Sequence, residues 1–220
     1  MTTLRLYSYW RSSSSWRVRI GLGLKGLAYQ CVPVNLLTGE QHSEAHRARS
    51  PMGQIPVLEV EEDGQVLRLV QSMAILEWLD ERFPDPPLLP ADLAGRARVR
   101  SLAEHVNSGI QPLQNAIVLR MLKERHPGYE KEWVRHWITV GLQGLEAAVN
   151  HGPVSRFCHG DAPGLAECYL VPQMYSARRF GVDVAPFPTL GRIEEACRAL
   201  APFQAAEPDR QSDAPPERTP

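Results

Sequence analysis

The first 83 residues change repeatedly between strand-like and helix-like patterns of hydrophobic and polar positions. Residues 4–9 are short, aromatic and bounded by polar positions, and residues 29–34 form a second apolar run, so we predict a strand in each. Between them, the apolar positions fit a period of two and also a helical face. Serines that can cap a helix precede this segment and Lys25-Gly26 can end one, which favours a helix over residues 16–27.

Two further strands and a helix follow in the same segment. Residues 55–60 and 66–69 have strand character, and Asp63-Gly64 between them is a typical hairpin turn. Residues 72–83 then follow helical spacing. The predicted order of elements is therefore β-α-β followed by β-β-α.

A proline-rich stretch separates this segment from a helical one. Residues 84–90 hold four prolines in seven positions, so they can form neither a helix nor a central strand. Strand signals nearly vanish after it. Helical spacing covers residues 91–124 (interrupted at Pro112), 130–149, 165–180 and 190–200. In the helix over residues 130–149, we expect the core positions to be Trp133, Trp137, Val140, Leu145 and Val149.

These patterns predict two domains. An α/β domain spans residues 1–83, a linker spans 84–91, and an all-helical domain spans 92–206. Residues 207–220 hold four prolines and no large apolar side chain, so we expect an extended tail that cannot pack a core of its own.

Composition and charge narrow the class of protein. Among 220 residues, 24 Lys and Arg against 25 Asp and Glu leave a formal charge of -1, without the basic excess of a nucleic-acid-binding protein. The 43% of hydrophobic residues excludes general disorder. No apolar run is long enough to span a membrane, and the N-terminal residues lack the apolar core of a signal peptide. We therefore expect a cytoplasmic protein with neither a nucleic acid nor a membrane as partner.

The cysteines and histidines show no metal-binding pattern. Four cysteines lie far apart and are expected to be thiols, most of them buried: Cys31, Cys158, Cys168 and Cys197. Among seven histidines, only His42 and His46 have a ligand-like spacing, and they lie in a polar region. We predict no metal site.

Three short segments of the α/β domain could bind a ligand. Residues 11–17, Arg-Ser-Ser-Ser-Ser-Trp-Arg, lie between the first strand and the first helix, where helix N–H groups and hydroxyls can bind an anion. Ile55-Pro56 precedes a strand, and a cis proline there would expose the backbone of Ile55 to a peptide-like ligand. Gln71-Ser72 opens a helix and suits a carboxylate. Each segment alone also fits a purely structural role, such as a helix cap or a turn.

The whole chain resembles the zeta class of glutathione transferases, the maleylacetoacetate and maleylpyruvate isomerases. Ser12-Ser-Ser-Ser-Trp-Arg-Val-Arg-Ile20 is similar to the signature S-S-C-x-W-R-V-R-I of that class. Pro51-Met-Gly-Gln-Ile-Pro56 and Gln71-Ser-Met-Ala-Ile75 match its glutathione-binding segments. Residues 108–115, 170–173 and 179–180 match class-specific stretches of the helical domain. The resemblance implies a thioredoxin-like α/β N-terminal domain with Pro56 cis, an all-α C-terminal domain, and a homodimer.

The resemblance also implies a reaction and a cofactor, glutathione. In the family, the glutathione thiolate adds to the double bond of a maleyl group, the resulting single bond rotates, and elimination releases the trans product. Ser12, with Ser13 beside it, is implied to be catalytic, because a hydroxyl that donates to a thiolate lowers the thiol pKa without competing as a nucleophile. The substrate is a small dicarboxylate, and arginine suits its carboxylates.

Site residues follow from the resemblance position by position. Those implied to contact glutathione are Ser12, Ser13, Ser14, Ser15, Gln41, Ile55, Pro56, Gln71, Ser72, Gln111 and Asn115. Those implied to bind the substrate carboxylates are Arg11, Arg17 and Arg179. Residue chemistry alone leaves alternatives open: a structural salt bridge for Arg17, a surface ion pair for Arg179, and a buried network linking helices for residues 111–115.

The chain departs from the family pattern at three informative positions. Ser14 stands where most of the class has cysteine, so the reactive sulfur must come from glutathione. Gly164 replaces the capping Ser or Thr of a Ser/Thr-x-x-Asp box, and the reciprocal side-chain bond is expected to be lost. Gly53 replaces a lysine, which removes one possible carboxylate contact.

We expect isomerisation of maleylacetoacetate, an intermediate of tyrosine breakdown. The sequence leaves maleylpyruvate as an alternative substrate, because both carry a carboxylate beside the same cis double bond. Conjugation or dehalogenation of α-halo acids is a second alternative. A non-catalytic binding protein that retains the fold is a third.

Overall fold

The computed structural model describes residues 2–153 and 155–216, and the chain divides into two compact units. The first unit comprises residues 1–87 together with 201–220, and the second comprises residues 88–200. Each unit is described by itself.

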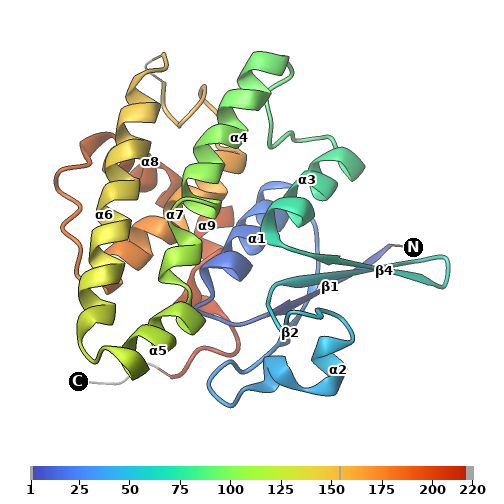
Figure 1. Cartoon of the computed structure of the whole chain (residues 1–220). Coiled ribbons are helices and arrows are strands. Elements are labelled where there is room, and N and C mark those ends of the chain that lie inside the picture. Colours follow the sequence, from blue (N-terminus) through green and yellow to red (C-terminus); the bar gives the residue numbers. More distant parts are fainter. Residues whose placement is uncertain (1, 154, 217–220) are drawn as a thin grey trace. The chain divides into compact units, whose positions relative to one another are not determined.

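The first unit is built on a four-stranded mixed sheet (Figure 1). Its strands are β1 (Thr3–Ser8), β2 (Gln30–Pro33), β3 (Val57–Glu62) and β4 (Gln65–Val70), in the spatial order β2-β1-β3-β4. β1 runs parallel to β2 and antiparallel to β3, and β3 pairs antiparallel with β4. Leu6 of β1 lies opposite Cys31 on one side and Leu58 on the other. This arrangement confirms the predicted thioredoxin-like domain.

Helices cover both faces of this sheet. α1 (Ser13–Leu24) and α3 (Ser72–Arg82) lie on one face, and the short turn η1 (Glu40–His42) and α2 (Glu44–Arg47) lie toward the other (Figure 1). Apolar side chains from β1, α1, β3 and α3 form the core beneath the helices: Leu4, Leu6, Val18, Leu22, Leu58, Val60, Ile75 and Leu79. All residues from Ser15 to Leu22 of α1 are buried, which explains why its sequence shows no clean amphipathic period.

The C-terminal segment belongs to the first unit, which differs from the predicted boundaries. The sequence predicts a helical domain up to residue 206, but the second unit ends at Leu200. α9 (Ala201–Ala206) packs on α1 instead, and a Cβ at Gly23 would lie 3.2 Å from Pro202 Cβ. Phe203 and Ala206 are buried. The predicted helical spacing ended at residue 200, and the sequence pattern could not reveal that residues 201–206 pack on α1.

The predicted extended tail also packs on this unit over its described length. Residues 208–210 form a 3-10 turn, η3 (Pro208–Arg210), in which Pro208 is buried. The tail has no core of its own, as its composition indicates, but it adds to the core of another segment. Residues 217–220 lie outside the described residues.

The second unit consists of packed helices. They are α4 (Leu93–Asn107), the 3-10 turn η2 (Gln111–Gln114), α5 (Ala116–Arg125), α6 (Tyr129–Asn150), α7 (Leu165–Arg179) and α8 (Pro188–Arg198) (Figure 1). α7 lies against α4, α6 and α8. Every residue from Leu165 to Met174 is buried, so this helix forms the centre of the unit. The structure therefore confirms that the second unit is all-helical.

The buried face of α6 agrees with the expected one at Leu145 and Val149 and differs from it at the other three expected positions. Val134, Ile138, Leu142, Leu145 and Val149 are buried, whereas Val140 is 43% exposed. Trp133 and Trp137 are half-buried, and the indole N–H of Trp133 donates to the Leu113 carbonyl oxygen at 2.9 Å. Tryptophan combines a large apolar ring with a polar group, so its presence does not mark the centre of a core.

The start of α7 keeps one of the two hydrogen bonds of a capping box, the bond between the Glu167 side chain and the N-cap backbone. The Glu167 carboxylate accepts hydrogen bonds from the Gly164 N–H at 2.7 Å and from the Cys158 N–H at 2.8 Å. Burial raises the pKa of Glu167, although these N–H groups oppose the shift. Only the half that needs a side chain at residue 164 is missing, because glycine has none.

Gly164→Ala should destabilise the second unit. A Cβ at residue 164 would lie 2.5 Å from the Leu88 carbonyl oxygen, which also accepts the Leu165 N–H at 2.8 Å. Overpacking of this kind costs about 1–3 kcal/mol. We expect a lower midpoint of urea unfolding followed by circular dichroism. The matched control is Gly191→Ala in α8, where a Cβ meets nothing within 4 Å and should be neutral or stabilising. Equal midpoints for the two variants would contradict this explanation of Gly164.

Candidate active site

Ser12 lies at the junction between β1 and α1 as the N-cap of the helix. Its φ and ψ are -66° and 117°, and its Oγ accepts a hydrogen bond from the Ser15 N–H at 3.2 Å. A serine hydroxyl that accepts this bond still has its own proton to donate. The first N–H groups of a helix lack intrahelical partners, so hydroxyl and helix end together suit an anion such as a thiolate.

The four serines differ in exposure. Ser12, Ser13 and Ser14 are half-buried, as is Arg11, whose guanidinium lies 5.0 Å from the Trp10 ring centroid. Ser15 is 0% exposed. The predicted glutathione contact by Ser15 is therefore wrong for its side chain, because that side chain is enclosed by protein and only its N–H serves the cap of Ser12.

Arg17 is enclosed as well, which corrects its predicted role in substrate binding. Its side chain is 1% exposed, and Nη1 donates to the Ser72 hydroxyl oxygen at 3.2 Å. Arg17 thus joins α1 to the first residue of α3. The burial of Arg17 favours the structural alternative over direct contact with a substrate carboxylate.

Ile55, Pro56 and Gln71 lie in two adjacent loops of the first unit. The Ile55–Pro56 peptide bond is cis, as predicted. Gln71, the N-cap of α3, has a φ of 70°, a left-handed value that is uncommon for residues other than glycine. Its Nε2 donates to Gln54 Oε1 at 3.2 Å, which ties the start of α3 to the segment before Pro56. Uncommon backbone conformations of this kind cluster at ligand sites.

Gln41 lies beside the same segment through η1. Its Oε1 is buried and has no hydrogen-bond partner within the described residues. Gly53 has a φ of 63°, and a Cβ there would lie 2.9 Å from the Gln41 carbonyl oxygen and 3.0 Å from His42 Nδ1. The close approach of residues 41 and 42 therefore explains why this chain has glycine where the family often has lysine.

The candidate residues of the second unit divide by environment. Asn115 is the N-cap of α5, and its Oδ1 accepts the Ile117 N–H at 3.0 Å. Gln111 is half-buried in η2, and its neighbour Gln114 is buried in a reciprocal amide pair with Gln173 of α7. The network linking helices that residue chemistry suggested is therefore present, formed by Gln114 rather than by Gln111.

Arg179 ends α7 with an exposed guanidinium. It lies 4.4 Å from the Phe180 ring centroid. The adjacent Arg178 pairs with Glu194 of α8, to which its Nη1 and Nη2 donate at 2.6 and 2.5 Å.

The thiols of the protein are poorly suited to nucleophilic chemistry. Burial raises the pKa of Cys31, Cys158 and Cys197, which keeps these groups protonated. All four cysteines are present as thiols. Within residues 2–153 and 155–216, no group of three or more His, Cys, Asp or Glu residues could hold a metal ion.

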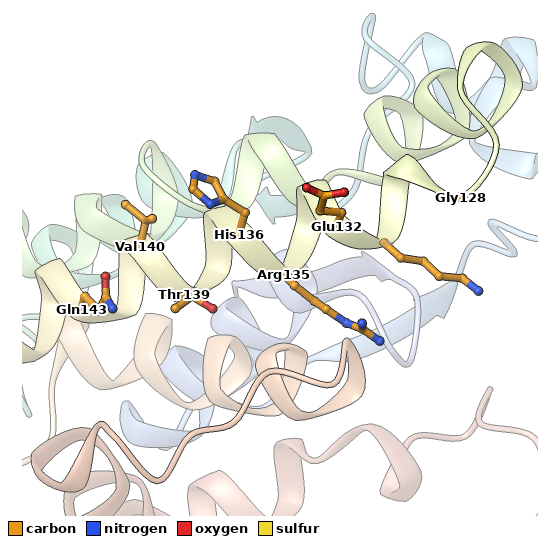
Figure 2. Close-up of a pocket in the computed structure, with 8 residues that line it drawn as sticks. Gly128, Glu132, Arg135, His136, Thr139, Val140 and Gln143 are labelled. Atoms are coloured by element: carbon orange, nitrogen blue, oxygen red, sulfur yellow. The ribbon is translucent and has the colours of Figure 1, made fainter.

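A surface groove runs along α6. Figure 2 shows its lining, formed by Gly128, Lys131, Glu132, Arg135, His136, Thr139, Val140 and Gln143. Arg135 Nε donates to the Phe180 carbonyl oxygen at 3.0 Å. No residue predicted for the active site lines this groove.

Sequence reasoning missed two residues that shape the serine loop. Arg19 is 1% exposed and donates to the carbonyl oxygen of Trp10 at 2.9 Å. Asp213 accepts the Trp10 N–H at 2.8 Å from a segment expected to be an unpacked tail. No local pattern points to Asp213, since the contact joins positions 203 residues apart.

Known proteins match nearly the whole chain in sequence. The model of the glutathione S-transferase N-terminal domain matches residues 2–81. The chain is 46% identical to a probable maleylacetoacetate isomerase of Drosophila melanogaster, over 96% of this chain and 91% of that protein. No helix within the described residues has the length and apolar character needed to cross a membrane.

Solved structures extend the comparison. A maleylacetoacetate isomerase from Anaeromyxobacter dehalogenans, with glutathione in its active site, is 69% identical with a TM-score of 0.91, over 97% of this chain and 99% of that one. A zeta-class maleylpyruvate isomerase is 40% identical with a TM-score of 0.91, over 96% of this chain and 100% of that one.

The fold and these comparisons together define a glutathione transferase. Within that class, the chain belongs to the zeta-class family of maleylacetoacetate and maleylpyruvate isomerases.

Proposed function

We propose that this protein is a glutathione-dependent cis–trans isomerase that converts maleylacetoacetate to fumarylacetoacetate. The observation that carries the proposal is the Ser12 cap at the start of α1, because its hydroxyl oxygen accepts the Ser15 N–H and still has a proton to donate to an anion. The identity with named maleylacetoacetate isomerases over nearly the whole chain supports the choice of reaction.

The residues of the first unit fit glutathione. Ser12 offers a hydroxyl donor, the N-terminus of α3 at Gln71-Ser72 offers N–H groups to a carboxylate, and Gln41 Oε1 is a buried acceptor without a partner among the described residues. Ile55 supplies backbone groups beside the cis proline. Bound glutathione supplies the thiolate that adds to the maleyl double bond and is eliminated after rotation.

The side chains of the protein have two tasks in this reaction. Ser12, with Ser13 beside it, holds negative charge on sulfur by hydrogen bonding, which favours the ionised thiol at neutral pH. Arg11 and Arg179 bind the substrate carboxylates, and an arginine fork suits that task. Gln111 and Asn115 contribute polar contacts from the helical unit. Arg17 supports the site indirectly, by holding Ser72.

A direct assay tests the proposal. Purified protein is incubated with glutathione and either maleylacetoacetate or maleylpyruvate, and formation of the fumaryl product is followed. We expect conversion that requires glutathione, with the higher kcat/KM for maleylacetoacetate. Absence of glutathione-dependent conversion of both substrates would refute the proposed reaction.

Maleylpyruvate is the second candidate substrate, favoured by the 40% identity to a zeta-class maleylpyruvate isomerase. A higher kcat/KM for maleylpyruvate in the same assay would support it. Turnover of an α-halo acid alone would indicate a conjugating or dehalogenating transferase. Failure to bind glutathione by calorimetry would indicate a non-catalytic protein that retains the fold.

We also propose that the protein is a cytoplasmic homodimer. The dimer is supported by β4, an edge strand on which Val66 and Leu67 are exposed. The cytoplasmic location is supported by the cysteines, which are thiols, as in a reducing compartment. Light scattering of the purified protein tests the dimer, and fractionation of cells that express it tests the location.

Arg179→Ala should raise KM for the maleyl substrate while KM for glutathione stays unchanged. Loss of a charge-assisted hydrogen bond is worth about 1.5–3 kcal/mol, so kcat/KM should fall roughly 10- to 100-fold. Arg179→Lys should recover part of the loss. The control is Arg125→Ala, another arginine in the last turn of a helix of the same unit, which should leave the kinetics unchanged. A parallel loss in the control would show that general charge, not the position of Arg179, is responsible.

A further inference from the structure

The C-terminal segment of the first unit returns to the loop that carries the serine motif. Asp213 Oδ2 accepts the backbone N–H of Trp10 at 2.8 Å. Trp10 is followed directly by Arg11 and Ser12, so this hydrogen bond lies two residues from the proposed thiolate donor.

The carbonyl group of Trp10 is held by a buried arginine, Arg19. Arg19 Nη2 donates to the Trp10 carbonyl oxygen at 2.9 Å, and Nη1 donates to the Ser8 hydroxyl at 3.1 Å. Arg19 Nε donates to the Ala206 carbonyl oxygen at 3.1 Å, at the end of α9. Burial lowers the pKa of Arg19 to about 10, which still leaves it charged at neutral pH, and the negative charge of Asp213 opposes the shift. Both backbone polar groups of Trp10 are thus fixed by charged side chains.

A backbone hydrogen bond within residues 9–12 also holds the segment before α1. The Ser12 N–H donates to the Tyr9 carbonyl oxygen at 3.0 Å, so residues 9–12 form a turn with Trp10 as one of its two central residues. Trp10 and Ser12 therefore belong to the same hydrogen-bonded turn, and the position of Trp10 constrains the backbone of Ser12.

The segment that carries Asp213 is itself anchored. Gln211 Nε2 donates to the carbonyl oxygens of Ala205 at 2.9 Å and Glu207 at 2.8 Å, and Pro208 is buried. Asp213 Oδ1 is buried with no hydrogen-bond partner among the described residues. A buried oxygen of this kind costs stability, so global stability alone does not account for an acidic residue at this position.

We propose that Asp213 is a positioning residue, which holds Trp10 and thereby fixes the Ser12 hydroxyl toward the glutathione sulfur. The C-terminal segment is then a working part of the glutathione site rather than a dispensable tail. This inference rests on the proposed function, because it assigns the Ser12 hydrogen bond to a bound thiolate.

Two variants of Asp213 and one matched control test the proposal. Asp213→Ala removes the acceptor of the Trp10 N–H. Asp213→Asn removes the charge but keeps an oxygen acceptor of the same shape. Asp209→Ala is the control, because Asp209 is an exposed acid of the same segment. The readout is the pKa of the glutathione thiol in the complex, obtained by titrating the ultraviolet absorbance of the thiolate, together with kcat and KM.

In Asp213→Ala, we expect the thiol pKa to rise by about one unit and kcat at neutral pH to fall about tenfold, with KM for the maleyl substrate unchanged. Asp213→Asn should show no rise in the thiol pKa, and Asp209→Ala should match the wild type. An unchanged thiol pKa in Asp213→Ala, or an equal rise in Asp209→Ala, overturns the inference while the proposed function stands. A wild-type protein that binds no glutathione overturns both.

A measurement on the wild type covers the case in which Asp213→Ala does not fold. The Trp10 N–H should be strongly protected from hydrogen exchange, because it is held by Asp213. Rapid exchange at Trp10 overturns the inference without any variant.

Discussion

Ser12→Ala should lower kcat for glutathione-dependent isomerisation roughly 10- to 100-fold at neutral pH, because a hydrogen bond to an ionised sulfur is worth about 1.5–3 kcal/mol. The loss acts through the thiol pKa, which should rise by about one to two units. Below the raised pKa, less thiolate is present and the variant is slow. Its rate should therefore keep rising with pH through a range in which the wild-type rate is already level, and the two rates should converge at high pH.

Ser12→Gly separates catalysis from helix capping. Alanine at an N-cap costs about 1 kcal/mol of stability, whereas glycine costs only a few tenths. Both variants lack the hydroxyl, so both should show the same kinetic loss, while only Ser12→Ala should show a clearly lower melting temperature. A Ser12→Gly variant with the wild-type rate and pH profile would refute the role assigned to the hydroxyl.

Lys25→Met should destabilise the first unit by about 3–5 kcal/mol, the usual effect of removing one partner of a buried ion pair. Lys25 Nζ lies 2.5 Å from Asp80 Oδ1, and the exposed fractions of the two side chains are 0% and 9%. Nζ also donates to the Phe83 carbonyl oxygen at 2.7 Å, which joins the ends of α1 and α3. The loss would leave the Asp80 carboxylate buried without this ammonium. Urea unfolding followed by circular dichroism measures it.

Two further variants make the test specific. Arg5→Ala breaks the half-exposed pair with Glu61 and should cost at most about 1 kcal/mol. The double variant Lys25→Met/Asp80→Leu replaces the whole pair by apolar groups and should recover most of the stability lost in Lys25→Met. If Lys25→Met is no less stable than Arg5→Ala, burial of the pair is not the cause of its contribution.

Local patterns predicted most of the secondary structure and several contacts. The Asp63-Gly64 turn, the proline-rich separator and the serine cap each depend on backbone properties of a few adjacent residues. The cis bond at Pro56 followed from motif resemblance, which carries the geometry of related proteins. The local pattern was wrong about part of the buried face of α6. Trp133, Trp137 and Val140 fit the apolar face of a helix by their spacing, but the structure leaves them partly exposed.

The amino-acid sequence by itself determined the class of the protein: a β-α-β, β-β-α domain with a serine-headed helix, followed by helices, without a thiol of its own at the signature. Only the tertiary structure decided which of these residues can meet a ligand. It enclosed Ser15 and Arg17, paired Arg178 with Glu194, and brought Asp213 to Trp10. The physical reason is that caps and turns depend on neighbours in the chain, whereas burial and long-range hydrogen bonds depend on the packing of distant segments.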